Sequence, residues 1–169
     1  MPHRGKISGQ ALKRKFKVVG LGGTFDEFHR GHRALLMKAF ESGDRVLIGL
    51  VTDKFGEKIR KGHEIATYEE REKELVGFLE KIGFLNRAEI IPLDDAYGPA
   101  ATSIEQQAIV VSRETEPVAL KINQVRRRNG LLPLEVIVID MVPAENHVPI
   151  STTRIRYREI DREGRLLSR

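Results

Sequence analysis

The sequence contains no cysteine among its 169 residues. This absence excludes disulfide bonds, zinc–thiolate sites and cysteine nucleophiles. No apolar run approaches the roughly 18 residues that a membrane-spanning helix needs, and the N-terminus lacks the apolar core of a secretory signal. Aromatic residues make up only 6% of the chain, which is few for a protein that stacks nucleic-acid bases. We therefore expect a cytoplasmic protein with no membrane or nucleic-acid partner.

Positive charge is concentrated at the N-terminus. Residues 1–17 hold six basic groups and no acidic one, which leaves a nearly neutral remainder of 23 basic and 24 acidic groups. Such a uniformly charged, apolar-poor segment is typical of a solvated extension. We expect residues 1–15 to form this extension, residues 1–14 to be dispensable, and residues 16–169 to form a single domain. The sequence does not reveal the oligomeric state, and a monomer is compatible with it.

Short apolar segments alternate with segments of helical periodicity along the rest of the chain. Strands are expected at 16–21, 45–51, 88–93, 107–112 and 134–141, helices at 31–42, 67–82, 117–129 and 151–161, and loops at 52–66 and 94–105. Gly43 and Gly130 are expected to close helices, and Thr67 with Glu70 predicts a capping box. The alternation predicts a doubly wound α/β fold with a five-stranded parallel sheet, and ligands at the carboxyl ends of its strands.

A glycine-rich segment follows the first expected strand. It reads Gly22-Gly23-Thr24-Phe25-Asp26-Glu27-Phe28-His29-Arg30-Gly31-His32. Glycines let backbone N–H groups approach an anion closely, and the N-terminus of the following helix adds partial positive charge. Two imidazoles three residues apart can face the same pocket. The segment predicts a cradle for the phosphates of a nucleotide, with both imidazoles lining an open cleft where neither supports the fold.

Other interpretations of this segment are weaker. A pair of histidines alone would be compatible with an ordinary turn. A zinc site would need a third ligand, and none is positioned in the segment. Neither the dinucleotide fingerprint G-x-G-x-x-G nor a Gly-Lys-Ser/Thr phosphate loop is present. The whole string resembles the GGTFDxFHxGH signature of the HxGH nucleotidyltransferase superfamily, which implies a Rossmann-like nucleotidyltransferase fold.

Later segments resemble one family within that superfamily. Residues 91–99 (IPLDDAYGP), 109–115 (IVVSRET) and 122–126 (INQVR) are similar to the phosphopantetheine adenylyltransferases of archaeal and eukaryotic type, and residues 150–156 (ISTTRIR) to a motif of the whole superfamily. The resemblance covers roughly residues 16–162. It implies transfer of AMP from ATP to 4′-phosphopantetheine, which gives 3′-dephospho-coenzyme A and pyrophosphate in coenzyme A biosynthesis. The alternatives are an adenylyltransferase with an FMN or nicotinamide mononucleotide acceptor, or a regulatory protein that has lost catalysis.

The resemblance also implies roles for particular residues. The catalytic residues would be Thr24, His29, His32 and Lys58, with Lys58 preferred over Lys61 and Lys54. The nucleotide-binding residues would be Gly22, Gly23, Thr24, Phe25, His29, His32, Ser112, Glu114, Ser151, Thr152, Thr153 and Arg154. The phosphopantetheine-binding residues would be Thr24, Lys58, Lys61, Asp95, Tyr97 and Arg113.

Several of these residues have ordinary structural alternatives. Helix capping would account for Ser112, Thr115 and the hydroxyls of residues 151–153. Arg154 could lie on a solvated face. Asp95 and Tyr97 could equally shape a tight loop without contacting a substrate. Arg71, early in its helix, is expected to be structural.

The implied reaction is a direct displacement at the α-phosphorus of ATP. The attacking phosphate is already an anion, so positioning and charge stabilisation supply most of the acceleration. His29 and His32 would neutralise charge on the α- and β-phosphates, and residues 151–153 would hold the leaving pyrophosphate. Mg²⁺ is expected to accompany ATP through phosphate oxygens and water, with no metal site built from protein ligands.

Overall fold

The computed structural model describes residues 14–60 and 62–168. Its centre is a five-stranded sheet in the order β3-β2-β1-β4-β5, and all four strand pairs are parallel. The strands are β1 (Phe16–Gly23), β2 (Gly43–Val51), β3 (Ala88–Leu93), β4 (Ala108–Ser112) and β5 (Glu135–Ile139). The expected doubly wound α/β fold with a five-stranded parallel sheet is confirmed.

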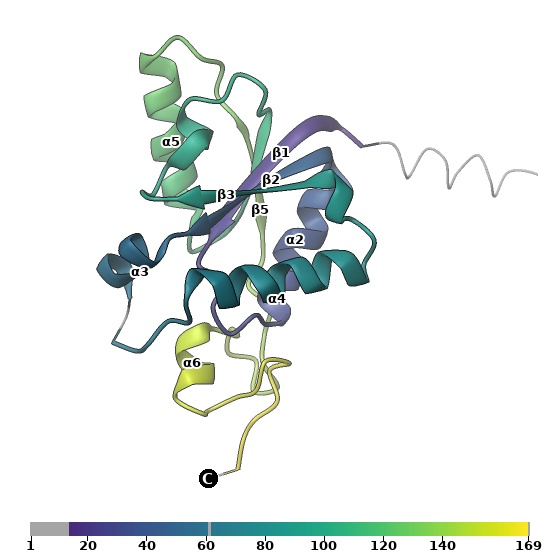
Figure 1. Cartoon of the computed structure of the whole chain (residues 1–169), viewed down its shortest axis with the longest axis vertical. Coiled ribbons are helices and arrows are strands. Elements are labelled where there is room, and N and C mark those ends of the chain that lie inside the picture. The colour runs from purple at the N-terminus through teal and green to yellow at the C-terminus, as the bar shows by residue number, and fades with distance from the viewer. Residues whose placement is uncertain (1–13, 61, 169) are drawn as a thin grey trace, which may run out of the picture.

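Helices cover both faces of this sheet (Figure 1). One face packs α2 (Arg30–Ser42) and α4 (Tyr68–Lys81) into the main core, where Leu36 and Leu75 are completely buried. The opposite face of β4 and β5 packs α5 (Glu116–Arg128) through a second core. Two single-turn helices, η1 (Leu85–Arg87) and η2 (Gly98–Ala101), lie in the connections around β3.

Glycines occupy several positions of the central strands on the face opposite the main core. Alternation along β1 and β2 puts Gly20, Gly22 and Gly49 on the face away from the main core. A Cβ atom at Gly22 or at Gly49 would come within 3.2 Å of the Leu93 side chain. The glycines therefore form the floor of a groove that no larger residue could line without displacing Leu93.

One expected loop contains a helix. The segment 52–66 was expected to be irregular, but residues Asp53–Ile59 form α3. Thr52 caps this helix by accepting a hydrogen bond from the Phe55 N–H at 3.2 Å. Its seven residues include Gly56, and a helix this short with an internal glycine has no visible hydrophobic period. Tertiary contacts stabilise it instead, since the Asp53 carboxylate accepts hydrogen bonds from the Tyr68 N–H and the Arg71 guanidinium.

The last helix is shorter than expected. The range 151–161 was predicted, but α6 spans only Thr152–Arg156. Arg158 adopts a left-handed conformation with φ of 59°, which ends the helical path. Ile160 then pairs with Leu166 in an antiparallel bridge and is completely buried. The apolar residues that suggested further helical turns belong to this compact C-terminal turn.

The predicted caps are mostly confirmed. Thr67 and Glu70 form the expected capping box at the start of α4, and Gly130 is left-handed after α5 with φ of 74°. Gly43 ends α2 but is extended, with φ of −131°, because β2 begins there directly. A Cβ at Gly43 would lie 2.6 Å from a Val19 methyl group, so close packing is what requires glycine. No helix in the described part of the chain is long and apolar enough to cross a membrane.

Candidate active site

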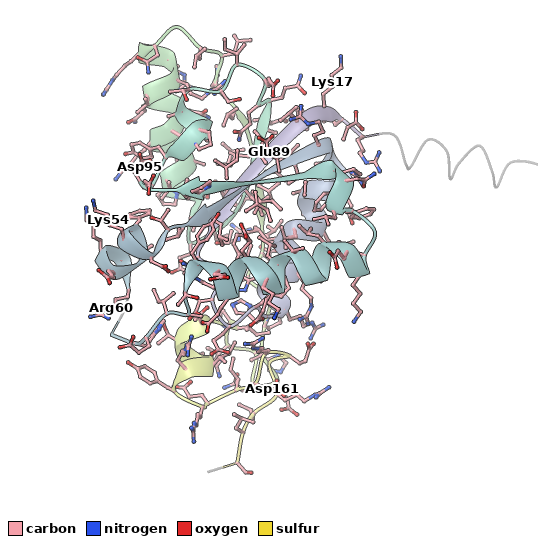
Figure 2. All side chains as sticks on the ribbon, in the orientation of Figure 1. Lys17, Lys54, Arg60, Glu89, Asp95 and Asp161 are labelled. Carbon is pink, nitrogen blue, oxygen red and sulfur yellow. The ribbon has the colours of Figure 1, made fainter. Side chains whose placement is uncertain are left out.

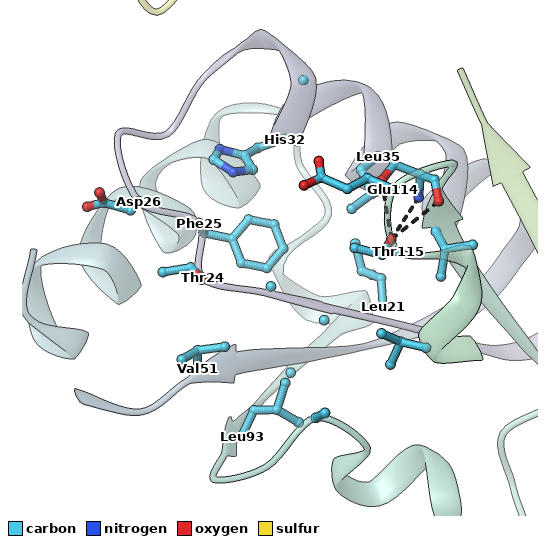
Figure 3. A pocket seen from close by; sticks show the side chains of 18 of the residues that line it. Leu21, Thr24, Phe25, Asp26, His32, Leu35, Val51, Leu93, Glu114 and Thr115 are labelled. Carbon is cyan, nitrogen blue, oxygen red and sulfur yellow. Dashed lines mark hydrogen bonds between the residues drawn. The ribbon is translucent and has the colours of Figure 1, made fainter. Parts of the chain in front are cut away.

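A cavity of about 550 Å³ opens at the carboxyl edge of the sheet and continues along the glycine groove. Its wall combines the β1–α2 loop, the end of α3, the β3–η2 connection, the end of β4 and the start of α6. Figure 3 shows Thr24, Phe25 and His32 on one side of it, with Glu114 and Thr115 on another. Segments far apart in sequence therefore meet at the sheet edge where a parallel α/β fold binds ligands.

The β1–α2 loop is held in a strained conformation. Phe25 and Glu27 have φ values of 52° and 50°, in the left-handed region that costs energy for residues with a side chain. Asp26 between them is 1% exposed. Its carboxylate accepts two hydrogen bonds from the Arg156 guanidinium, at 2.9 and 3.2 Å, and one from the Ala66 N–H at 3.0 Å. These bonds hold the loop in place and aim it at the cavity.

His29 and His32 cap the helix that follows this loop. The Nδ1 atom of His29 accepts hydrogen bonds from the Gly31 N–H at 3.0 Å and the His32 N–H at 3.4 Å. In return, Nδ1 of His32 accepts one from the His29 N–H at 3.1 Å. The two rings stack with centroids 3.7 Å apart. The pair is thus a capping box made of imidazoles, and it satisfies N–H groups that the helix leaves unpaired.

The expectation that neither imidazole supports the fold is wrong. His29 is only 6% exposed, and the His32 ring lies against the rings of Phe25 and Phe28 at 5.2 and 5.7 Å. Both residues nevertheless line the cavity. A capping role and a position in the cleft were expected to exclude each other. In the structure both histidines have a structural role and also lie at the site.

Both imidazoles are neutral at neutral pH. Burial, assisted by the charges of Arg33 and Arg162, lowers the pKa of His29 from 6.5 to about 4, against a smaller opposite effect of Asp26. Burial, with His29, Arg162 and Arg33, brings the pKa of His32 well below its usual 6.5. Since each Nδ1 accepts a hydrogen bond, each ring carries its proton on Nε2. The pair presents two neutral N–H donors on the edges opposite the caps.

The start of α6 forms another part of the wall. Ser151, Thr152 and Thr153 all line the cavity, and each hydroxyl has a partner. The Ser151 oxygen accepts from the Arg154 N–H at 3.2 Å, and the Thr152 hydroxyl donates to the Asp26 carbonyl at 3.0 Å. The Thr153 hydroxyl lies 3.2 Å from Nε2 of His63. The predicted N-cap at Ser151 is confirmed, and Thr152 ties α6 to the β1–α2 loop.

The end of β4 contributes Ser112, Glu114 and Thr115. The Thr115 hydroxyl oxygen accepts a hydrogen bond from the Ser112 N–H at 3.1 Å and lies 3.2 Å from the Ser112 hydroxyl. Thr115 therefore orders the turn between β4 and α5, although its side chain makes no capping bond to α5. The hydroxyls of Ser112 and Thr115 can therefore both order the turn and line the site.

The lysines expected to act from the segment 52–66 differ in position from the residues that line the cavity. Lys58 is exposed in the last turn of α3 and is not part of the wall, and Lys61 lies outside the described residues. Arg60, by contrast, lines the cavity beside His63. Figure 2 shows Arg60 and Lys54 on the side of the molecule where α3 projects. Arg60 was not predicted, because the family resemblance implies a lysine in this loop.

Three other side chains that were predicted to contact a substrate bind other groups of the protein instead. The Asp95 carboxylate accepts hydrogen bonds from two backbone N–H groups of its own turn, so it shapes the loop, while Tyr97 lines the cavity. Arg113 is not part of the wall, and it donates at 2.8 Å to Asp140, which is. Arg154 donates to two backbone carbonyls and to the side chains of Asn146 and Glu159, away from the cavity. Arg154 therefore neither reaches the cavity nor lies on a solvated face, because its guanidinium joins α6 to the preceding loop.

Sequence reasoning also missed a C-terminal clamp on the β1–α2 loop. Arg162 donates to Glu27 at 3.0 Å and to Glu74 of α4 at 2.6 Å, and its carbonyl accepts from the Arg30 N–H at 3.0 Å. Glu163 pairs with Arg33 at 2.6 Å. No sequence signal links these residues, since they are more than 80 positions apart. The expected structural role of Arg71 is confirmed by its buried bonds to the ends of β1 and β2.

Carboxylates near the cavity are mostly paired with cations. Asp26 is bound to Arg156, and Asp140 to Arg113. Within residues 14–60 and 62–168, no group of three or more His, Asp or Glu side chains is arranged to hold a metal ion.

The fold and this site define a nucleotidyltransferase: residues 21–158 match the model of the cytidylyltransferase-like family. The chain is 46% identical to a phosphopantetheine adenylyltransferase of Methanothermobacter thermautotrophicus over 94% of both chains, and 48% identical to one of Methanopyrus kandleri over 84% of this chain and 90% of the relative. It belongs to the phosphopantetheine adenylyltransferase family. A crystal structure from Archaeoglobus fulgidus, of a protein of unknown function, is similar with a TM-score of 0.66 and 28% identity, covering 79% of this chain and 98% of the other.

Proposed function

We propose that the cavity binds ATP and 4′-phosphopantetheine together, and that the chain transfers AMP to the phosphate of the acceptor. The products are 3′-dephospho-coenzyme A and pyrophosphate. The observation that carries this proposal is that the family-like segments, remote from one another in sequence, line one cavity. They are the β1–α2 loop, Tyr97, the end of β4 and the start of α6.

The β1–α2 loop supplies the means of stabilising charge. The attacking phosphate is an anion at neutral pH and needs no general base. Charge increases on the bridging and α-phosphate oxygens during the displacement, and preorganised donors there lower the barrier. His29 and His32 suit this role, because their Nε2–H groups are fixed by the capping bonds made at Nδ1. Thr24, which lines the cavity beside them, is assigned to the transferred and attacking phosphates.

The leaving pyrophosphate is assigned to residues 151–153 at the start of α6. The hydroxyls of Thr152 and Thr153 already have partners, so the backbone N–H groups and the Ser151 hydroxyl are the better donors. Arg60, which directly follows α3, lines the cavity and supplies a positive charge there. We therefore propose Arg60 beside the predicted Lys58 and Lys61 as the residue that neutralises the phosphates.

Mg²⁺ is proposed to enter with ATP. The paired state of Asp26 and Asp140 fits an ion that keeps phosphate oxygens and water as its ligands. When bound, the ion would neutralise phosphate charge and leave the positioning to the protein.

The acceptor is tested by measuring pyrophosphate release from ATP with a panel of phosphate acceptors. Phosphopantetheine should support Mg²⁺-dependent release well above FMN, nicotinamide mononucleotide and glycerol phosphate. Omission of the acceptor is the control for plain ATP hydrolysis. Faster turnover of FMN or nicotinamide mononucleotide would contradict the assigned acceptor, and release without any acceptor would contradict the transfer itself.

A further inference from the structure

Gln106 is a buried polar residue at the deep end of the cavity. It immediately precedes β4, is 4% exposed, and lines the cavity wall. Its carboxamide lies over Gly20, where an added Cβ would come within 2.6 Å of the Gln106 Cδ atom. The glycine thus makes room for the amide group on the floor of the groove. Neither the family-like motifs nor the proposed phosphate chemistry gives this side chain a role.

The orientation of the Gln106 amide is fixed. Its Nε2 donates to the Ala108 carbonyl at 3.1 Å, which identifies the other atom as the oxygen. Its backbone N–H donates to the Ser103 hydroxyl oxygen at 3.2 Å. Among the residues that the structure describes, none donates a hydrogen bond to Oε1. Oε1 is not enclosed by protein atoms, and Gln106 lines the cavity, so this oxygen is an acceptor open to a ligand N–H.

The groove connects this acceptor to the phosphate chemistry. Gly20 and Gly22 form its floor, Leu93 lies on the β3 side, and Val118 with Ile122 of α5 lies on the other. Four residues of extended strand separate Gly20 from Thr24, which corresponds to about 13 Å at roughly 3.3 Å per residue. The lining of this passage is largely apolar, which suits a mostly aliphatic chain that carries a few polar groups.

We propose that Gln106 determines acceptor specificity by accepting a hydrogen bond from the distal amide N–H of the pantetheine arm. This inference rests on the proposed function and adds a residue that recognises the acceptor. The distal amide nitrogen is about ten bonds from the phosphorus, and an extended chain covers roughly 3.3–3.6 Å for every three bonds. The amide therefore lies about 11–12 Å from the phosphate, close to the about 13 Å of strand between Thr24 and Gly20, the residue beneath the Gln106 amide. The proximal amide is too near the phosphate to reach it.

The experiment removes the two partners separately. On the ligand side, phosphopantetheine is compared with an analogue whose distal amide is an ester, which deletes only the N–H. On the protein side, Gln106→Leu is compared with wild type. The control Gln107→Leu changes the neighbouring glutamine, whose side chain is exposed and accepts from the Lys17 N–H outside the cavity. Steady-state kcat and KM are measured for each acceptor and for ATP.

Wild type and Gln107→Leu should show a KM for the ester analogue roughly tenfold above that for phosphopantetheine, the worth of one buried hydrogen bond. Their kcat should change little, because the reacting phosphate is the same. In Gln106→Leu the ratio of the two KM values should fall to about one. The wild-type comparison needs no variant, so it can still overturn the proposal if Gln106→Leu does not fold.

Equal KM values for amide and ester in wild type would overturn the proposal. So would a Gln106→Leu enzyme that raises the KM for ATP instead of that for the acceptor, since the purine amino group is the other N–H donor available. Failure of wild type to use phosphopantetheine at all would instead contradict the proposed function, and that result is obtained before any comparison.

Discussion

At the scale of single residues, His29 has two tasks on opposite edges of one ring. Nδ1 accepts the N–H groups that begin α2, and Nε2–H is the donor assigned to phosphate. Burial lowers the pKa to about 4, so the ring stays in the one neutral form that can do both. A protonated ring would carry hydrogen on both nitrogens and lose the cap.

Substituting His29 separates the two tasks. In His29→Asn the side-chain oxygen can still cap α2, because asparagine is a favoured N-cap residue, but the Nε2–H donor is lost. We expect kcat to fall about a hundred- to thousandfold, with a melting temperature close to that of wild type. His29→Ala should lose similar activity and, in addition, about 0.5–2 kcal/mol of stability with the cap.

The measurement is kcat, the dissociation constant for ATP and the melting temperature on the same two variants. Full kcat in a stable His29→Asn would remove the imidazole from the chemistry and leave it as a cap alone. An asparagine variant as unstable as the alanine variant would show that ring packing, not the capping bond, is what the fold needs.

At the scale of elements, ion pairs from α6 and from the C-terminal turn hold the β1–α2 loop. Arg162 joins Glu27 of the loop to Glu74 of α4, while Arg156 binds Asp26. Glu27 is left-handed and Asp26 lies between the left-handed Phe25 and Glu27, so α6 and the C-terminal turn together hold a strained backbone in place. The positive charge of Arg162 also contributes to the lowered pKa values of both histidines.

Neutralising Arg162 should therefore change the pH dependence of activity. In Arg162→Gln the pKa values of His29 and His32 should rise towards 6.5, because one repelling charge is gone. Each histidine is neutral above its pKa, so activity is lost as pH falls through that value, and the acid limb of kcat/KM should move to higher pH. The control Arg165→Gln removes an exposed charge that is paired with Asp161 and does not contribute to the lowered pKa of either imidazole.

The pH profiles of kcat/KM between about pH 4 and 8 check this prediction. Equal loss of activity at every pH would mean that Arg162 acts only by holding the loop. A shift of the same size in Arg165→Gln would show that overall charge, not the clamp, sets the pKa values.

At the scale of the whole molecule, the first described residues, 14 and 15, contact later parts of the chain. Arg14 donates to the Phe40 carbonyl at 3.2 Å, and Lys15 pairs with Glu135 at 3.1 Å. The earlier part of the predicted basic extension, residues 1–13, lies outside the described residues. The division into an extension and a single domain from residue 16 remains a prediction.

A protein that begins at Arg14 should keep the activity and melting temperature of the full chain. The reason is that the removed segment is basic and poor in apolar residues, so it has little surface to pack. Kinetics with ATP and thermal unfolding of the two proteins provide the comparison. Loss of ATP binding on truncation would mean that the extension belongs to the site.

Local patterns in the sequence determined the order of strands and helices along the chain, the parallel sheet and the position of the glycine-rich β1–α2 loop. Apolar strands, capping residues such as Thr67, and the string from Gly22 to His32 act over short distances, so a linear reading recovers them. The short helix α3 was missed because its stability comes from Asp53 contacts with a later helix, which no local period records.

Only the tertiary structure decided which polar groups surround the cavity and in what state. The neutral histidines depend on burial and on Arg162, which is 130 positions or more away in sequence. The engagement of Arg154 and Arg113 elsewhere, and the entry of Arg60 and Gln106 into the wall, also depend on packing. The physical reason is that pKa values and hydrogen-bond partners follow from distances in space, whereas sequence motifs record only which residue types the chain carries.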